Sequence, residues 1–234
     1  MASDEKREAS IATDIQKTLK QGKTVWLKTP EKTFLSLYTN VPKSNRKGII
    51  LLLHDMGGNP EQEQVIQALR QFLPIHQWAT LSVQMPLREA SASMTDYEDL
   101  FPDAKQRLIS AVNFARTENA ENVIIIGYGL GALMTTYALS DTSINVDGLI
   151  LISLPVTVNI NPLPFIGTSH LPILDIYAEL DIPEVISHSD ERLVLGKKNT
   201  FFRQVKFENE GHAYSNDNLR LLKLIYGWAD RMIA

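Results

Sequence analysis

The stretch VIIIGYGLGALM, Val123 to Met134, decides how the chain folds. A run of β-branched apolar residues ends in glycines, and a helical pattern follows from Leu130. This order predicts a strand that turns sharply into a helix. Such a turn presents a nucleophile, binds a nucleotide or is simply a tight bend. The residues elsewhere in the chain must distinguish these three roles.

Apolar runs and helical patterns alternate on both sides of this turn. The run GIILLLH at 48–54 shows no polar alternation, which is typical of a strand covered on both faces. Repeated alternation predicts an α/β fold, with a mostly parallel sheet flanked by helices on both faces. We expect strands at 24–28, 33–38, 48–54, 79–83, 122–126, 148–152, 173–177 and 202–207, and helices at 65–73, 97–116, 130–139 and 218–232.

The chain is expected to form one α/β domain at 23–234, preceded by a helical extension at 1–22. Ile11, Ile15 and Leu19 recur at intervals of four residues, which predicts a short amphipathic helix in that extension. Prolines are frequent between residues 155 and 170, so this segment is expected to be a loop across the ligand end of the sheet. No sizeable lid domain is predicted.

Composition excludes several classes of function. The formal net charge is -4, which is unfavourable for binding nucleic acid. Cysteine is absent and the histidines show no ligand spacing, so neither a metal nor another cofactor is predicted. No apolar run is long enough to span a membrane, and the charged start of the chain lacks a signal-like segment. A soluble protein is expected, periplasmic if a signal was removed and otherwise cytoplasmic.

A dinucleotide site fits the turn poorly. Gly127, Gly129 and Ala132 satisfy a loose G-x-G-x-x-A pattern. That fingerprint also needs an acidic residue at the end of the next strand, where it binds ribose. Asp147 precedes its strand instead, and the strand leads into Ser153. The pattern therefore does not favour nucleotide binding.

A hydrolase-like arrangement uses more of the chain. In G-x-S-x-G turns the strand, the nucleophile, an acid and a histidine follow one another in that order. Asp181 follows the strand ILDIY, and His212 follows the last strand, so both fall where the acid and the base are expected. The backbone amides of Met56 and Leu130 stand where oxyanion donors occur.

These features together resemble the α/β-hydrolase superfamily, and more closely a bacterial family of uncharacterised α/β-hydrolase-like proteins. The resemblance extends from about residue 35 to 228. It depends on FLSLY, LLLHDMGG, WATLSVQMP, IGYGLGA, LPILDIYAELDIPEV and the histidine of GHAY. Some relatives are exported, which agrees with a periplasmic location.

The sequence departs from that family at three positions. The resemblance implies a serine in the turn, a histidine before it and a glycine after His54, but the chain has Gly129, Tyr128 and Asp55 there. Glycine has no atom with which to attack a carbonyl, and loss of the serine from a comparable triad costs about 10⁶-fold in kcat. A carboxylate at Asp55 would also oppose a developing oxyanion. We therefore expect a vacant nucleophile position, with His54, Asp55 and Tyr128 lining the former pocket.

Other residues offer alternatives that the sequence leaves open. Tyr128 has a poorly nucleophilic phenol, and we expect the turn to aim it away from the apex. Ser153 ends the next strand near the ligand edge, which leaves open an approach to His212, but we expect its hydroxyl to bond local backbone. We expect Ser215 to help cap the last helix with Asn216 and Asp217. The sequence also leaves open that His212 with Asp181 activates water, or that each has only a structural role.

Three functions follow from these residues. The first is a catalytically inactive pseudo-hydrolase that binds a protein partner, as an interaction or assembly component. The second is an esterase-type hydrolase that uses His212 and Asp181 with water or an unusual nucleophile. The third is a receptor for a small acyl or lipid-like ligand in the former substrate cleft.

Overall fold

A single eight-stranded sheet organises the protein. The computed structural model describes residues 3–140 and 144–233, with the strands in the order β1-β2-β4-β3-β5-β6-β7-β8. From β4 to β8 the strands are parallel, whereas β2 pairs antiparallel with both β1 and β4. The predicted α/β architecture is confirmed. The strands are β1 (Lys23–Lys28), β2 (Thr33–Thr39), β3 (Gly48–Leu53), β4 (Trp78–Val83), β5 (Val123–Tyr128), β6 (Gly148–Ile152), β7 (Ile173–Leu180) and β8 (Phe202–Gly211).

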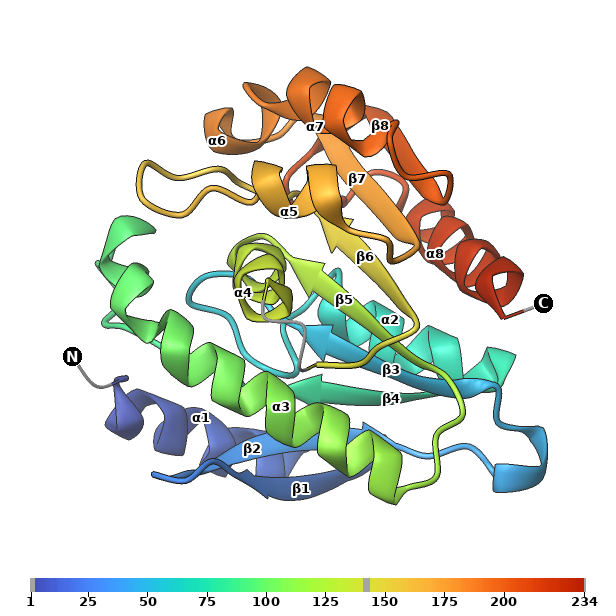
Figure 1. Ribbon diagram of the computed structural model, residues 1–234. Helices are drawn as coiled ribbons and strands as arrows, with labels where there is room; N and C mark the ends of the chain where they lie inside the picture. Colours follow the sequence, from blue (N-terminus) through green and yellow to red (C-terminus); the bar gives the residue numbers. More distant parts are fainter. Residues whose placement is uncertain (1–2, 141–143, 234) are drawn as a thin grey trace.

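Helices cover both faces of the sheet (Figure 1). One face carries α3, α4, α5 and α7, and the other carries α1, α2 and α8. The α-helices are α1 (Glu5–Thr18), α2 (Ile66–Phe72), α3 (Phe101–Thr117), α4 (Leu130–Leu139), α5 (Leu163–Thr168), α6 (Pro183–Ile186), α7 (Ser189–Gly196) and α8 (Asn218–Met232). Short 3₁₀ helices are η1 (Lys43–Asn45), η2 (Leu73–His76) and η3 (Thr95–Leu100).

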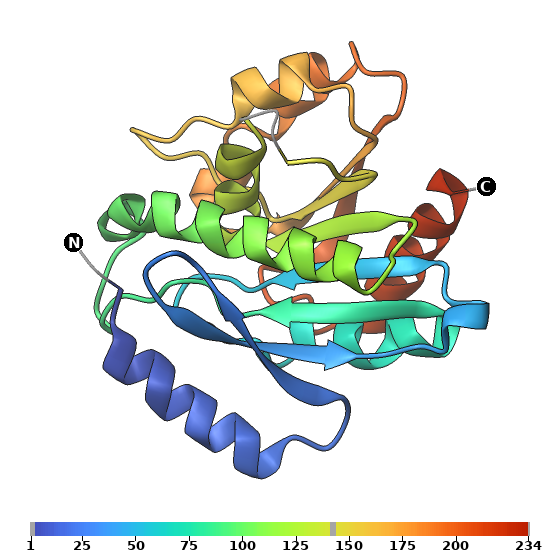
Figure 2. The same cartoon turned by 60° about the horizontal axis from the view of Figure 1, so that its bottom comes forward.

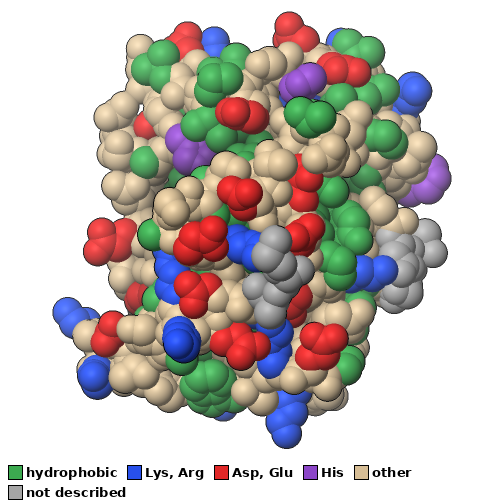
Figure 3. Space-filling view, turned by 90° about the vertical axis from the view of Figure 1, so that its left-hand side faces the viewer, with side chains coloured by type: hydrophobic (Ala, Val, Ile, Leu, Met, Phe, Trp, Pro, Cys, Tyr) green, Lys and Arg blue, Asp and Glu red, His purple; other side chains and the backbone are tan. Residues whose placement is uncertain are grey.

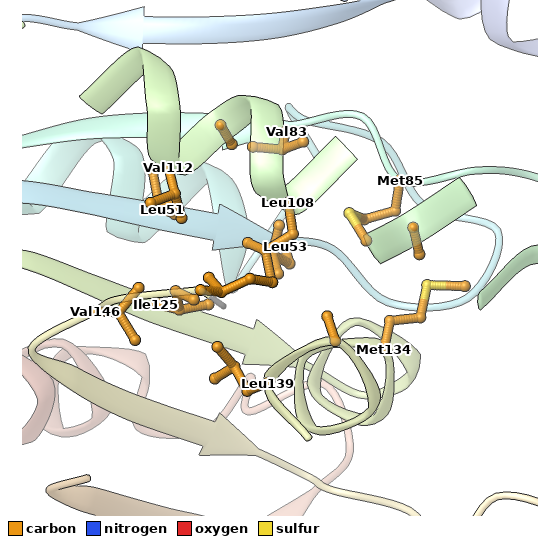
Figure 4. Packing of buried hydrophobic residues seen from close by; sticks show 14 of the residues in the cluster. Leu51, Leu53, Val83, Met85, Leu108, Val112, Ile125, Met134, Leu139 and Val146 are labelled. Carbon is orange, nitrogen blue, oxygen red and sulfur yellow. The ribbon is translucent and has the colours of Figure 1, made fainter. Parts of the chain in front are cut away.

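The two central strands are buried on both sides, as their unbroken apolar sequences predict. Every residue of β3 and β5 is buried. Alternate side chains enter opposite layers: Leu51, Leu53 and Ile125 join the layer under α3 and α4, shown in Figure 4. Ile50 and Ile124 join the layer under α2 and α8. This double burial fixes the positions of the strand ends, where the candidate site lies.

The N-terminal helix α1 packs across the outer part of the sheet (Figure 2). Asp4 caps it by accepting a hydrogen bond from the Arg7 amide. Its Ala12 and Ile15 lie against β2. In the first turn of the helix, Glu8 forms an ion pair with the buried Arg107 of α3, at 2.9 Å.

The proline-rich segment at 155–170 was predicted to be a loop, but part of it is helical. It contains the short helix α5, which buries Leu163 and Ile166. Pro164 lies in the first turn of that helix, where a missing amide hydrogen costs nothing and the fixed φ favours helix formation. The helices α6 and α7 between β7 and β8 were also not predicted. None of these elements forms a sizeable lid.

All the parallel strands point toward one edge of the molecule. Figure 3 views the molecule from that side, and acidic side chains gather across the middle of the face. The turns after β3, β5 and β7 and the residues after β8 meet at this edge, because the carboxyl ends of parallel strands lie together. Residues far apart in the sequence are thereby brought into contact.

The ion pair between α1 and α3 gives a test of how firmly α1 is held. Replacing Glu8 with Ala leaves the fully buried Arg107 with only Asp103 as a charged partner among the described residues, at 3.0 Å. We expect the free energy of unfolding to fall by about 1–3 kcal/mol. Urea denaturation measures it. Glu31→Ala, at an exposed carboxylate, is the control and should change stability by less than about 0.5 kcal/mol.

Candidate functional site

The turn after β5 has a strained backbone that only glycine adopts readily. Gly129 has φ 54° and ψ -121°. Its amide donates to Ile152 O at 2.9 Å, and its own carbonyl accepts from Ala132 at 3.0 Å as α4 begins. Close packing also requires Gly127, where a Cβ atom would overlap the Ala132 backbone. The strand-to-helix turn predicted from the sequence is therefore present with Gly129 at its apex.

The carboxylate of Asp55 lies directly over Gly129. Its Oδ1 accepts a hydrogen bond from the Leu130 amide at 2.7 Å, and its Oδ2 lies 2.9 Å from His212 Nε2. A Cβ atom built on Gly129 would overlap this carboxylate. A side chain at position 129 and the observed Asp55 conformation thus exclude each other.

Asp181 and His212 meet at the ends of β7 and β8. The distance from His212 Nδ1 to Asp181 Oδ1 is 2.5 Å. Asp181 Oδ1 also accepts from the Ile182 amide, and Oδ2 accepts from the Ser153 hydroxyl and the Ala178 amide. These donors hold a buried carboxylate in its ionised form. Burial would raise the pKa of Asp181, but the hydrogen bonds with His212 and Ser153 lower it overall.

His212 lies between two carboxylates. Burial alone would lower the pKa of its imidazole, but the hydrogen bonds and negative charges of Asp181 and Asp55 outweigh burial and raise the pKa to about 10. At neutral pH the ring is therefore an imidazolium, which donates one hydrogen bond from each nitrogen. A charged ring has no lone pair with which to accept a proton from water or a hydroxyl.

Tyr128 supports the histidine without reaching its nitrogens. Its ring stacks on the imidazole with centroids 5.2 Å apart, and its hydroxyl donates to His212 O at 2.9 Å. Burial, and next the charges of Asp55 and Asp181, raise the pKa of Tyr128. The phenol is thus neutral and engaged with backbone, which is unfavourable for a nucleophile.

His54 anchors the loop that carries Asp55. Its Nε2 accepts from the Met85 amide at 2.9 Å, so the proton resides on Nδ1, which donates to Asp55 O at 2.8 Å. Burial lowers the pKa of His54 to about 4, so this ring is neutral. The Asp55 amide donates to Gln62 Oε1 at 3.1 Å. Both the backbone amide and the backbone carbonyl of Asp55 are therefore held by hydrogen bonds.

The extension also reaches this loop, a contact that the sequence analysis missed. Arg7 of α1 donates to Gly57 O at 3.0 Å and to Arg88 O at 2.6 Å. No local pattern signals this contact, because an arginine near a helix start resembles any exposed charge. The helix α1 is thereby joined to the Asp55 loop.

Two serines have different partners. The Ser153 hydroxyl was expected to bond local backbone, but it donates to Asp181 Oδ2 at 2.5 Å and lies 2.9 Å from the Tyr214 hydroxyl. That expectation was wrong because β6 and β7 are neighbours, and their ends bring the side chains together. At α8, Asp217 supplies the side-chain cap, and Ser215 is exposed.

The two predicted oxyanion donors have different surroundings. The Leu130 amide is already bonded to Asp55. Met56 lies next to Asp55 in the chain with its side chain 38% exposed. Within residues 3–140 and 144–233, no group of three or more His, Asp or Glu side chains is arranged to hold a metal ion. The same residues contain no helix long and apolar enough to cross a membrane.

Solved structures with the same architecture carry hydrolase names. The esterase Pf2001 of Pyrococcus furiosus aligns with a TM-score of 0.75 at 14% identity, covering 91% of each chain. Est1E from Butyrivibrio proteoclasticus gives 0.71 at 12% identity, covering 90% of this chain and 98% of its own. The esterase domain of a Rhodothermus marinus protein gives 0.71 at 14%, covering 91% and 99%. At such identities the likeness shows the fold alone, which is that of the α/β-hydrolases.

The family follows from the sequence itself. Residues 2–105 and 102–231 match the family described as "Protein of unknown function (DUF3530)", and the chain belongs to it. No curated protein matches the sequence. The chemistry must therefore be inferred from the geometry of the site.

The charge of His212 can be measured directly. We expect the imidazole of His212 to titrate with a pKa of about 10 in NMR experiments on selectively labelled protein. Asp55→Asn keeps the shape of the side chain but removes one of the two negative charges, so it should lower the pKa of His212. A ring that titrates near 6.5 in the wild type would contradict the arrangement.

The same shift makes stability depend on pH. Because the pKa of His212 is higher in the folded than in the unfolded state, its contribution is fully present below about pH 6.5 and is lost as pH rises toward about 10. We expect the stability difference between wild type and His212→Gln to shrink across that interval. Urea denaturation of both proteins from pH 6 to pH 10 measures it, and a constant difference would be the contrary result.

Proposed function

We propose that the protein is a pseudo-hydrolase: an α/β-hydrolase fold that does not hydrolyse esters and works by binding, as a protein-interaction or assembly component. One observation carries the proposal. The Asp55 carboxylate accepts a hydrogen bond from the Leu130 amide and from His212 Nε2. These are the two groups that acyl transfer would need free.

The Asp55 carboxylate occupies the place that the carboxylate of an ester-hydrolysis product would take. One carboxylate oxygen takes the amide that would stabilise an oxyanion, and the other takes the imidazole nitrogen that would receive a proton. A substrate carbonyl would have to displace a negative charge that is fixed by His54 and Gln62 through its own backbone. The site is therefore closed by the protein itself.

The remaining groups support the same conclusion. Gly129 has no side-chain atom to attack a carbonyl. The raised pKa of His212 keeps the ring protonated at neutral pH, which opposes general-base catalysis. Asp181 and Tyr128 then stabilise a charged histidine rather than activate a nucleophile.

Because Gly129 supplies no nucleophile, we expect the protein not to react with serine-directed reagents. Purified protein should not be labelled by a fluorophosphonate and should give no burst with p-nitrophenyl acetate, because both ring nitrogens of His212 are bonded to carboxylates and no hydroxyl in residues 3–140 and 144–233 is hydrogen-bonded to them. Intact-mass spectrometry and stopped-flow absorbance measure both. Stoichiometric labelling would overturn the proposal.

Two variants separate the missing hydroxyl from the blocking carboxylate. Gly129→Ser alone should remain unlabelled, because the new side chain would meet Asp55. Combined with Asp55→Gly, it supplies the hydroxyl, frees the Leu130 amide and removes one charge from His212. We expect the double variant to be labelled at least about tenfold faster than either single variant. Equal labelling of the single and double variants would show that Asp55 does not close the site.

A hydrolase that activates water through His212 is the second candidate. The observation that favours it is the 2.5 Å contact between His212 and Asp181, the pairing that general-base catalysis requires. It requires a measurable turnover that His212→Ala abolishes. The third possibility, a receptor for an acyl or lipid-like ligand, requires space beside Gly129 that the Asp55 carboxylate fills.

A further inference from the structure

The strand β8 is an edge strand that remains open on one side. It has ten residues, pairs with β7 alone among the described strands, and most of its side chains are exposed or half-buried. The Ile173 amide donates to Phe201 O, so the odd-numbered residues that follow direct their backbone groups toward β7. Gln204 and Lys206 consequently direct theirs outward, because alternate residues of a strand bond to opposite neighbours. Such an edge is a template for another strand.

A groove of about 520 Å³ lies between β8 and α8. Arg203 and Val205 line it from β8, on one face of the strand because they are two residues apart. Lys223 and Leu224 line it from α8. Any strand added beside β8 would place every second side chain on this same face of the sheet.

The groove is positively charged in a protein of net charge -4. Within residues 3–140 and 144–233, neither Arg203 nor Lys223 forms an ion pair, whereas the neighbouring Lys206 is paired with Glu179 and Glu208. Arg220 adds a third cation, whose guanidinium lies 4.6 Å from the ring of Phe207. Asp217 is the acidic residue of the lining, and it is engaged in capping α8 through the Arg220 amide. The local field therefore attracts negative charge.

We propose that the open edge of β8 and this groove bind an extended acidic segment of a partner protein. The segment adds as a strand beside β8, with backbone hydrogen bonds to Gln204 and Lys206. Its acidic side chains, at alternate positions, face Arg203, Arg220 and Lys223. Backbone pairing supplies affinity, and the cations select an acidic sequence.

A second copy of this chain is a poorer occupant of the same place. Two-fold pairing of β8 with itself would set both grooves on the same face of the joined sheet, where the Arg203, Arg220 and Lys223 cations of one copy would repel those of the other. The proposed surface also shares no residue with the Asp55 and His212 cluster. Binding at this surface is therefore independent of whether the Asp55 and His212 cluster is catalytically active.

The test uses the full-length protein and a synthetic peptide. The probe is an end-capped octapeptide of alternating threonine and glutamate, compared with its lysine counterpart and with a peptide whose glutamates form one block. We expect the alternating acidic peptide to bind more tightly than either control, and binding to weaken with salt. Hydrogen exchange followed by NMR should show the amides of Gln204 and Lys206 becoming protected.

Charge-reversal variants assign the binding to the groove. Arg203→Glu with Lys223→Glu should weaken peptide binding about tenfold. Lys17→Glu with Lys43→Glu makes the same change in net charge at exposed positions elsewhere, and should leave affinity within about twofold. Equal weakening in the two variants, or unchanged exchange at Gln204 and Lys206, would overturn the proposal. Fluorophosphonate labelling is measured separately, so this failure would not be confused with failure of the proposed inactivity.

Discussion

The site depends on one electrostatic arrangement, an imidazolium held between two carboxylates. Asp55 and Asp181 lie 2.9 Å and 2.5 Å from the two nitrogens of His212. Charges in a largely buried position are tolerated only when they are paired and hydrogen-bonded, and here each group satisfies the others. Asp181 is completed by Ser153 and backbone amides, and Asp55 by the Leu130 amide. Removal of His212 would leave the two carboxylates without the cation that lies between them.

The arrangement also couples parts of the chain that are remote from the turn. Arg7 fastens α1 to the carbonyl of Gly57, two residues beyond Asp55. Glu8, the next residue of the helix, is paired with the buried Arg107 of α3. The extension is thus part of the support of the site and not a separate appendage. Asp55 and Gly57 lie in the same short loop, and His54 and Gln62 hold the backbone of Asp55. A change in α1 that moves Gly57 would therefore act on the position of Asp55 through this loop.

The fold and the function follow from different features. The sheet order and strand-to-helix turn are those shared with solved esterase structures, and they require only buried strands and glycines. A few side chains at the strand ends set the chemistry, and the proposed partner surface lies at a different edge, along β8 and α8. In the function that we propose, one scaffold keeps its architecture while Asp55 closes the catalytic position and another surface binds the partner.

The sequence by itself determined the sheet, most helices and the strand-to-helix turn at Gly129, because these depend on apolar periodicity, on glycine and on the order of residues along the chain. It also placed Asp181 and His212 at strand ends, although their 2.5 Å contact had to be observed. Only the tertiary structure decided where the Asp55 carboxylate points. Its partner His212 is 157 residues away, and no local pattern encodes a side-chain direction that is selected by a neighbouring strand end. The same reason explains the contact between Ser153 and Asp181: parallel pairing of β6 and β7 unites residues that the sequence keeps apart.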